Sequence, residues 1–141
     1  MSTWPAVAVA VTFLWLGMVL AISFLEAPLK FRARGVTLPI GLGIGRLVFR
    51  ALNSVEVVFA VVILATAVAG PPQAAVTVAF IVAFATLGLQ LGAVRPRLNR
   101  RSDAVVAGLE APRSRGHYVY VGLELIKVLA LAGAGILLLS S

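Results

Sequence analysis

The residues of this sequence that could do chemistry are polar and ionisable side chains placed at the turn spacing of an α-helix. They form two stripes, one with successive spacings of 4, 3 and 3 residues and one with spacings of 3, 4 and 3. Residues three or four apart lie on one face of a helix, so each stripe predicts a polar helical face. The first stripe comprises Arg46, Arg50, Asn53 and Glu56, and the second comprises His117, Tyr120, Glu124 and Lys127.

Three more polar side chains complete the candidate site. Glu26 and Lys30 are one helical turn apart, and Gln90 lies near the end of a long apolar run. All eleven side chains share one expected depth in the molecule, so we predict that they form one polar site. Its chemistry centres on Glu26, Glu56 and Glu124, three carboxylates on three different predicted helices.

Two uses of these carboxylates stay open. They could bind or pass an ion, a proton or a small polar solute. They could instead form structural pairs, as Glu124 and Lys127 could at a spacing of three residues, because each hydrogen bond stabilises a membrane bundle by roughly 0.6–2 kcal/mol. A charge at mid-membrane costs about 2.5–3.5 kcal/mol, so either use requires partners.

A divalent metal ion, held by the three carboxylates and His117, is a further alternative. Carboxylate-bridged metal bundles use Glu-x-x-His pairs, whereas His117 precedes Glu124 by seven residues. The chain has one histidine and no cysteine, which excludes a haem held by two histidines, cysteine metal sites and thiol catalysis. We therefore predict no cofactor.

Four long apolar runs must position these side chains. At about 1.5 Å per residue, some 20 helical residues span roughly 30 Å, the thickness of membrane hydrocarbon. Apolar runs of this length form helices, because the strands of a barrel would alternate over about 10 residues. Trp15, in the first run, is expected to contact lipid. We predict an all-α membrane protein, a single-domain four-helix transmembrane bundle with spans at about residues 6–25, 46–69, 74–94 and 117–139.

The connections between the spans are predicted as loops over residues 26–45 and 95–116. Residues 35–45 are apolar but rich in glycine and proline, and they are too few to span a membrane. This pattern indicates an interfacial or partly re-entrant loop. Within the second loop, Ser102-Asp103 could cap a short surface helix that runs through Gly108.

The basic residues predict an orientation. Eleven of the 12 lysines and arginines lie in or beside the two loops, and only Lys127 lies within a span. The positive-inside rule places the loops in the cytoplasm and both termini outside. We predict an integral protein of a bacterial inner membrane, whose basic loops contact anionic lipid headgroups.

Composition supports a bilayer rather than a soluble environment. Hydrophobic residues make up 61% of the 141 residues, against about 45–50% in soluble domains. The net charge of +7 could suggest nucleic-acid binding. We reject nucleic acid as a partner because the basic residues lie at the ends of apolar runs.

The distribution of polar residues bears on partners. The predicted outer half of the bundle is almost purely apolar, so one copy lacks a polar path across the membrane. Transport would therefore require a homo-oligomer or a larger membrane complex.

One short motif has a counterpart in a known family. Arg46, Asn53 and Glu56 resemble the Arg…Asn-x-x-Glu motif of the MAPEG family, the small four-helix membrane eicosanoid and glutathione enzymes. In that family the motif lies on the second helix and helps bind glutathione at a trimer interface. The resemblance implies an intramembrane enzyme that binds glutathione or a lipid substrate, although the family's landmarks on helices three and four are not evident here.

A second resemblance covers most of the chain. Residues 27–32 (Ala-Pro-Leu-Lys-Phe-Arg), residues 45–49 (Gly-Arg-Leu-Val-Phe), Pro96-Arg97 and His117 are similar to motifs of the bacterial four-helix membrane proteins related to eukaryotic transmembrane protein 205. The order and placement of these motifs agree with that family. The resemblance implies the fold and topology but no reaction.

We favour a non-enzymatic membrane protein with a cytoplasm-facing polar site. Such a protein would transport or sense an ion or small polar solute, or serve as an accessory subunit of a membrane complex. The MAPEG-like enzyme is the alternative.

Overall fold

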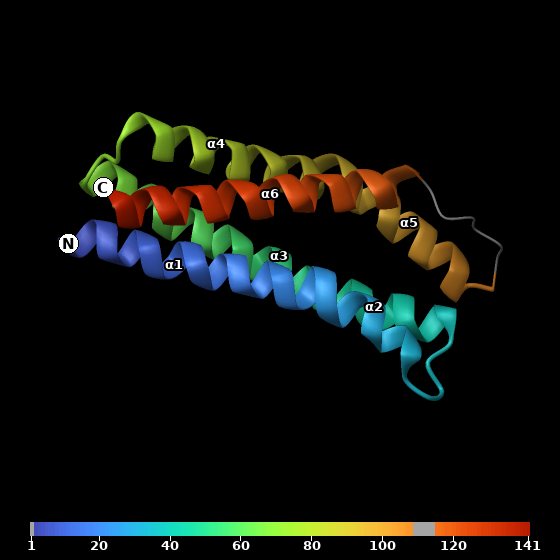
Figure 1. Ribbon diagram of the computed structural model, residues 1–141. Helices are drawn as coiled ribbons and strands as arrows, with labels where there is room; N and C mark the ends of the chain where they lie inside the picture. The colour runs from blue at the N-terminus through green and yellow to red at the C-terminus, as the bar shows by residue number, and fades with distance from the viewer. Residues whose placement is uncertain (1, 109–114) are drawn as a thin grey trace.

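The computed structural model describes residues 2–108 and 115–141 (Figure 1). Within these ranges the chain is helical, without strands. Four helical stretches are long and apolar enough to cross a membrane, which confirms the predicted number and type of candidate spans. They cover Thr3–Arg32, Leu38–Ala69, Ala74–Val105 and Tyr118–Ser140.

The first stretch changes its helical geometry near its end. It consists of α1 (Thr3–Val19), a π-helical segment η1 (Leu20–Glu26), the short α2 (Ala27–Leu29) and a 3₁₀ turn η2 (Lys30–Arg32). Pro28 has no N–H to donate to the preceding turn, and its ring would crowd the carbonyl four residues earlier. The wider π-helical turns lie immediately before this proline, where they accommodate it.

The third stretch repeats this arrangement. It consists of α4 (Ala74–Leu89), a π-helical segment η3 (Gln90–Val94) and α5 (Arg95–Val106), with Pro96 in the first turn of α5. Each π-helical segment therefore ends two residues before a proline. π-Helical turns often occur at functional sites, and these two contain the polar residues Ser23 and Gln90.

The predicted loop over residues 26–45 is largely wrong. Only residues 33–37 lie outside helices, and α3 (Leu38–Ala69) begins eight residues before the predicted span. Thr37 caps this helix, since its hydroxyl accepts a hydrogen bond from the Ile40 N–H at 3.4 Å.

Close packing explains the glycines of this segment. Gly41 and Gly45 are buried on one face of α3. A Cβ atom at Gly41 would overlap the Phe31 ring, and one at Gly45 would lie 3.0 Å from Lys30 Nζ. The glycines let η2 approach the helix, whereas the sequence pattern indicated a flexible loop.

The predicted loop over residues 95–116 is also partly wrong. Helix α5 continues through Val106, so Ser102-Asp103 lies inside a helix rather than at its start. Gly108 has a φ of +85°, the left-handed conformation with which glycine commonly follows a helix. Residues 109–114 lie outside the described ranges.

The helices form an elongated bundle with two different ends (Figure 1). Helix α1 packs against α3 and against α6 (Arg115–Ser140), and α6 packs against α4. Both termini lie at one end together with the turn at residues 70–73, and we call it the terminal end. The opposite end, which α2, α5 and the start of α3 form, is called the basic end.

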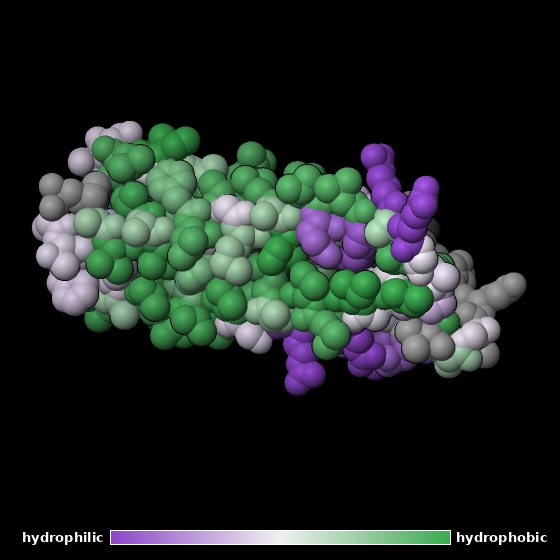
Figure 2. Space-filling view, turned by 90° about the horizontal axis from the view of Figure 1, so that it is seen from below, coloured by the Kyte–Doolittle hydropathy of each residue, from purple (hydrophilic) through white to green (hydrophobic). Residues whose placement is uncertain are grey.

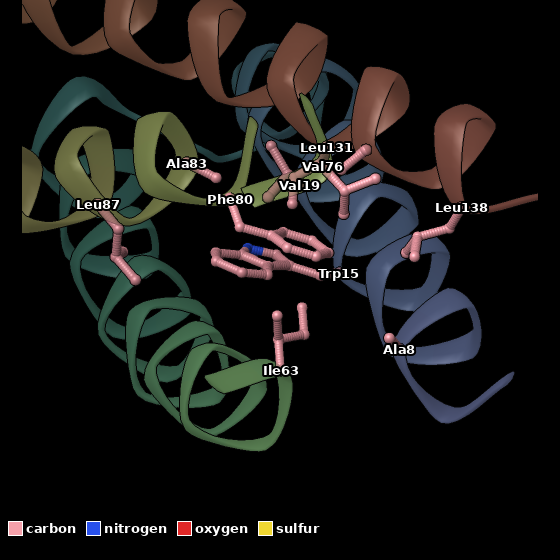
Figure 3. Close-up of a cluster of buried hydrophobic side chains, with 11 residues drawn as sticks. Ala8, Trp15, Val19, Ile63, Val76, Phe80, Ala83, Leu87, Leu131 and Leu138 are labelled. Carbon is pink, nitrogen blue, oxygen red and sulfur yellow. The ribbon is translucent and has the colours of Figure 1, made fainter. Parts of the chain in front are cut away.

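The interior holds a cluster of buried apolar side chains from all four stretches (Figure 3). Trp15 lies at its centre and is 0% exposed, so the expected lipid contact is wrong. Its ring stacks on Phe84 with a centroid distance of 6.2 Å. Large apolar residues also cover the outside, where Val68 is 76% and Leu129 is 72% exposed. Figure 2 shows this apolar surface over most of one face, with the strongly hydrophilic residues gathered toward the basic end.

Candidate functional site

Lys127 is the centre of a buried polar network. Its ammonium group is 0% exposed and contacts three acceptors from three helical stretches. It donates to Glu56 Oε2 and, at 2.8 Å, to Gln90 Oε1, and it lies 2.7 Å from Glu124 Oε1. Lys127 thus makes two hydrogen bonds, to Glu56 and Gln90, and forms ion pairs with both Glu56 and Glu124.

Three further side-chain hydrogen bonds end on the two carboxylates that Lys127 contacts. Trp15 Nε1 donates to Glu56 Oε2 at 2.9 Å, and Ser23 Oγ donates to Glu124 Oε2 at 2.5 Å. Gln90 Nε2 donates to Glu124 Oε1 at 3.1 Å. The first helical stretch thus joins the other three. We call this set the buried network: Trp15, Ser23, Glu56, Gln90, Glu124 and Lys127.

The formal charges in the buried network do not balance. It holds two carboxylates and one ammonium group, so its fully ionised form has a net charge of −1. Glu56 Oε1 is also buried without a hydrogen-bond partner. An uncompensated buried charge is costly, so the network needs one proton or positive charge from its surroundings.

The structure brings together only part of the predicted site. Glu56, Gln90, Glu124 and Lys127 join in the buried network, and the Tyr120 carbonyl oxygen accepts from Gln90 at 3.5 Å. Polar residues from three helical stretches therefore meet in one group.

Other predicted members lie elsewhere. Glu26 lies 3.8 Å from Lys30 near the basic end, and no contact joins it to Glu56 or Glu124 among the described residues. The sequence left open whether Glu26, Glu56 and Glu124 converge, and the structure places Glu26 apart from the other two. Within the same ranges, no three histidine or acidic side chains come close enough to hold a metal ion.

The remaining polar residues of the two stripes have separate environments. Arg46 pairs with Asp103 of α5, and Arg50 is exposed outside the buried network. Asn53 is buried, but its Oδ1 has no hydrogen-bond partner. The side chain of His117 lies outside the described part of the chain.

Two residues of the buried network, Trp15 and Ser23, were not predicted as site residues from the sequence. Trp15 was assigned to lipid because it lies in an apolar run, yet its indole N–H needs an acceptor in an environment without water. That requirement was the available signal. Ser23 gave no comparable signal, because a hydroxyl in a helix can bond to its own backbone.

A cavity of about 440 Å³ extends from the buried network toward the basic end. Ser23 and Glu124 belong both to its wall and to the network. Four cationic side chains line it: Lys30, Arg46, Arg95 and Arg101. Its apolar wall includes Phe24, Phe31, Leu42, Phe49, Leu98 and Val121.

Aromatic rings hold two of these cations in place. The Arg95 guanidinium lies 4.8 Å from the centre of the Phe49 ring and 4.5 Å from that of Tyr120. Lys30 Nζ lies 5.5 Å from the Phe31 ring centre and 5.8 Å from that of Phe49. Cation–π attraction of this kind strengthens where water is excluded.

The apolar cluster separates this cavity from a smaller one at the terminal end. The second cavity has a volume of about 180 Å³, and Trp4, Gly70 and Gln73 contribute to its wall. Phe80 and Leu138 of the apolar cluster form its inner side. The polar cavity therefore ends inside the bundle, at Glu124.

The comparisons with known proteins place no constraint on this site. No protein-family model, curated protein or solved structure matches the chain. The two family resemblances therefore stay predictions.

Proposed function

We propose that this chain is an integral protein of a bacterial inner membrane, with the basic end in the cytoplasm and both termini outside. Four long apolar helices with outward-facing apolar side chains support membrane insertion. The positive-inside rule supports the orientation, because the basic residues gather at one end. The ligand then enters from the cytoplasm.

Within that membrane, the protein binds a small solute and serves in its transport or sensing. The observation that carries this proposal is the double role of Glu124, which lines the cavity and bonds to the buried network. A ligand near Glu124 competes for the bonds from Ser23, Gln90 and Lys127. Since these bonds join different helices, ligand binding changes how the helices pack.

A purely structural role explains less. It accounts for the pairing of Lys127 with Glu56 and Glu124. It does not account for a cavity of about 440 Å³ that reaches one of these carboxylates. Cavities of roughly 300–1,000 Å³ are typical of small-molecule sites.

The glutathione-binding enzyme gains no support from the contacts. Its three motif residues have three different environments. Arg46 pairs with Asp103, Glu56 joins the buried network, and the buried Oδ1 of Asn53 has no hydrogen-bond partner. Because the cavity ends inside the bundle, transport by this protein involves a second copy or another subunit. Glutathione nevertheless belongs among the ligands to be tested.

The test compares two glutamates in different environments. We expect at least one solute among citrate, glutathione, putrescine and potassium to raise the Tm of the purified protein in lipid nanodiscs. Glu124→Gln should change the size of this shift, because it alters the charge of the carboxylate that faces the cavity. Glu26→Gln is the comparison variant and should retain the wild-type shift, because Glu26 bonds to Lys30 of the cavity wall but neither lines the cavity itself nor bonds to the buried network.

Glutamine has nearly the shape of glutamate and keeps an acceptor for Lys127, so Glu124→Gln should fold. The proposal fails if no solute distinguishes Glu124→Gln from the wild type. For a solute that shifts the Tm, flux into proteoliposomes then distinguishes transport from sensing.

A further inference from the structure

Arg95 and Arg101 stand out among the cations that line the cavity at the basic end. Lys30 has Glu26 as a partner, and Arg46 has Asp103. Among the described side chains, no carboxylate lies within ion-pair distance of Arg95 or Arg101. The Nε atom of each is buried and has no hydrogen-bond partner. Buried polar groups are normally paired, so these two donors indicate a missing acceptor.

The position of Arg95 suits the binding of a flat anionic group. Its guanidinium packs against the rings of both Phe49 and Tyr120, which themselves pack edge to face with a centroid distance of 5.8 Å. Such packing limits the rotation of the side chain before a ligand arrives. A guanidinium presents paired N–H donors that match the oxygens of a carboxylate or phosphate.

The rest of the wall suits an apolar group. Phe24, Phe31, Leu42, Leu98 and Val121 line the same cavity. A bare inorganic anion would leave these side chains unused, whereas an anion with a short hydrocarbon portion would cover them. The burial of that portion is favourable in proportion to the apolar area removed from water.

The other charged groups decide where the anionic group binds. Glu124 at the inner end repels an anion, and its partners Ser23, Gln90 and Lys127 are already engaged. Asp103 is bound by Arg46. Among the described residues that line the cavity, Arg95 and Arg101 are the cations without a carboxylate partner.

We propose that the cavity binds an organic anion, a carboxylate or phosphate attached to an apolar portion, through Arg95 and Arg101. This assignment rests on the proposed role of the cavity as the ligand site, and it specifies the class of ligand. Both a membrane lipid and a soluble metabolite can supply this chemistry. The test must therefore include both sources.

The first arm measures soluble probes by calorimetry, with the protein in phosphatidylcholine nanodiscs. We expect hexyl phosphate to bind the wild type at least about tenfold more tightly than inorganic phosphate or hexanol. Only hexyl phosphate has both an anionic group and an apolar chain. Arg95→Gln and Arg101→Gln should each weaken its binding by about tenfold or more. Arg50→Gln is the matched control and should leave it unchanged, because Arg50 is exposed and does not line the cavity.

Arg95→Lys is a conservative variant that distinguishes lost ligand binding from lost folding. It keeps a positive charge beside the two rings but not the paired donors, so its affinity for hexyl phosphate should lie between those of the wild type and Arg95→Gln. Arg101→Gln is an independent second variant on the same wall.

The second arm adds phosphatidic acid to the nanodiscs. If a lipid is the occupant, phosphatidic acid should compete with hexyl phosphate in the wild type. If the occupant is soluble, hexyl phosphate should bind equally with and without the lipid. Either result agrees with the proposed ligand class.

Other outcomes separate the two proposals. Hexyl phosphate affinity that is unchanged in both arginine variants overturns the assignment to Arg95 and Arg101. If hexylamine or hexanol binds instead, and Glu124→Gln abolishes that binding, the cavity is a ligand site but the ligand is not an anion. If no probe binds in either arm, the proposed anion site fails together with the ligand-binding function.

Discussion

At the residue scale, Lys127 holds the polar interior together. Its ammonium group contacts side chains on three helical stretches through hydrogen bonds and ion pairs. Trp15 and Ser23 attach the first stretch to the same carboxylates. The two partner carboxylates are almost completely buried, with exposures of 0% and 1%. Removal of the ammonium group would leave both without a cation.

We therefore expect Lys127→Met to be one of the most damaging single substitutions in the chain. Methionine fills much of the same space but offers no donor. Breaking a buried pair by removing one partner typically costs about 3–5 kcal/mol, which is the loss expected in the free energy of unfolding. Chemical denaturation in nanodiscs or mild detergent measures this loss.

A second variant shows whether lost charge pairing or lost packing causes the destabilisation in Lys127→Met. Glu56→Gln combined with Lys127→Met removes one of the stranded carboxylates, so it should restore part of the stability lost in Lys127→Met. No recovery, or a loss below about 1 kcal/mol in the single variant, would contradict a network held by charge.

At the scale of the elements, the approach of η2 to α3 shapes the cavity wall. Phe31 lies against Gly41, and Lys30 lies against Gly45. Because a methyl group at position 41 would overlap the Phe31 ring, we expect Gly41→Ala to destabilise the protein by about 1–3 kcal/mol. It should also weaken ligand binding, because both Phe31 and Gly41 line the cavity.

Gly43→Ala is the matched control for this helix. A Cβ at Gly43 meets nothing within 4 Å, and alanine favours helix over glycine. Its thermal unfolding should therefore be unchanged or shifted upward. Equal destabilisation by both substitutions would show that helix α3 is sensitive throughout, and not only where η2 touches it.

These glycines also show what the sequence could and could not predict at this scale. Apolar runs and polar stripes predicted four helices and a meeting of Glu56, Gln90, Glu124 and Lys127, because length and spacing depend on helix geometry alone. A glycine-rich segment can indicate either a flexible loop or a closely packed helix. Only the position of Phe31 in the structure decides between these two interpretations. The rotation of Trp15 toward Glu56, and of Glu26 away from it, likewise depends on how whole helices pack.

At the scale of the whole molecule, charge and polarity follow one axis. The cationic cavity, the π-helical segments and the exposed basic residues lie toward the basic end, whereas the interior near the terminal end is mostly apolar. Under the proposed function, this asymmetry gives a ligand one side from which to enter, and the orientation in the membrane decides which side that is.

The absence of cysteine from the sequence makes that orientation directly measurable. We expect a membrane-impermeant thiol reagent to label Gln73→Cys in intact spheroplasts, because the turn at residues 70–73 lies at the terminal end. Ala33→Cys, between η2 and α3, should be labelled only after the membrane is opened. Leu129→Cys should resist the reagent in both cases, because this exposed position would face lipid rather than water. Labelling of Ala33→Cys but not Gln73→Cys in intact cells would reverse the orientation, and strong labelling of Leu129→Cys would contradict membrane insertion itself.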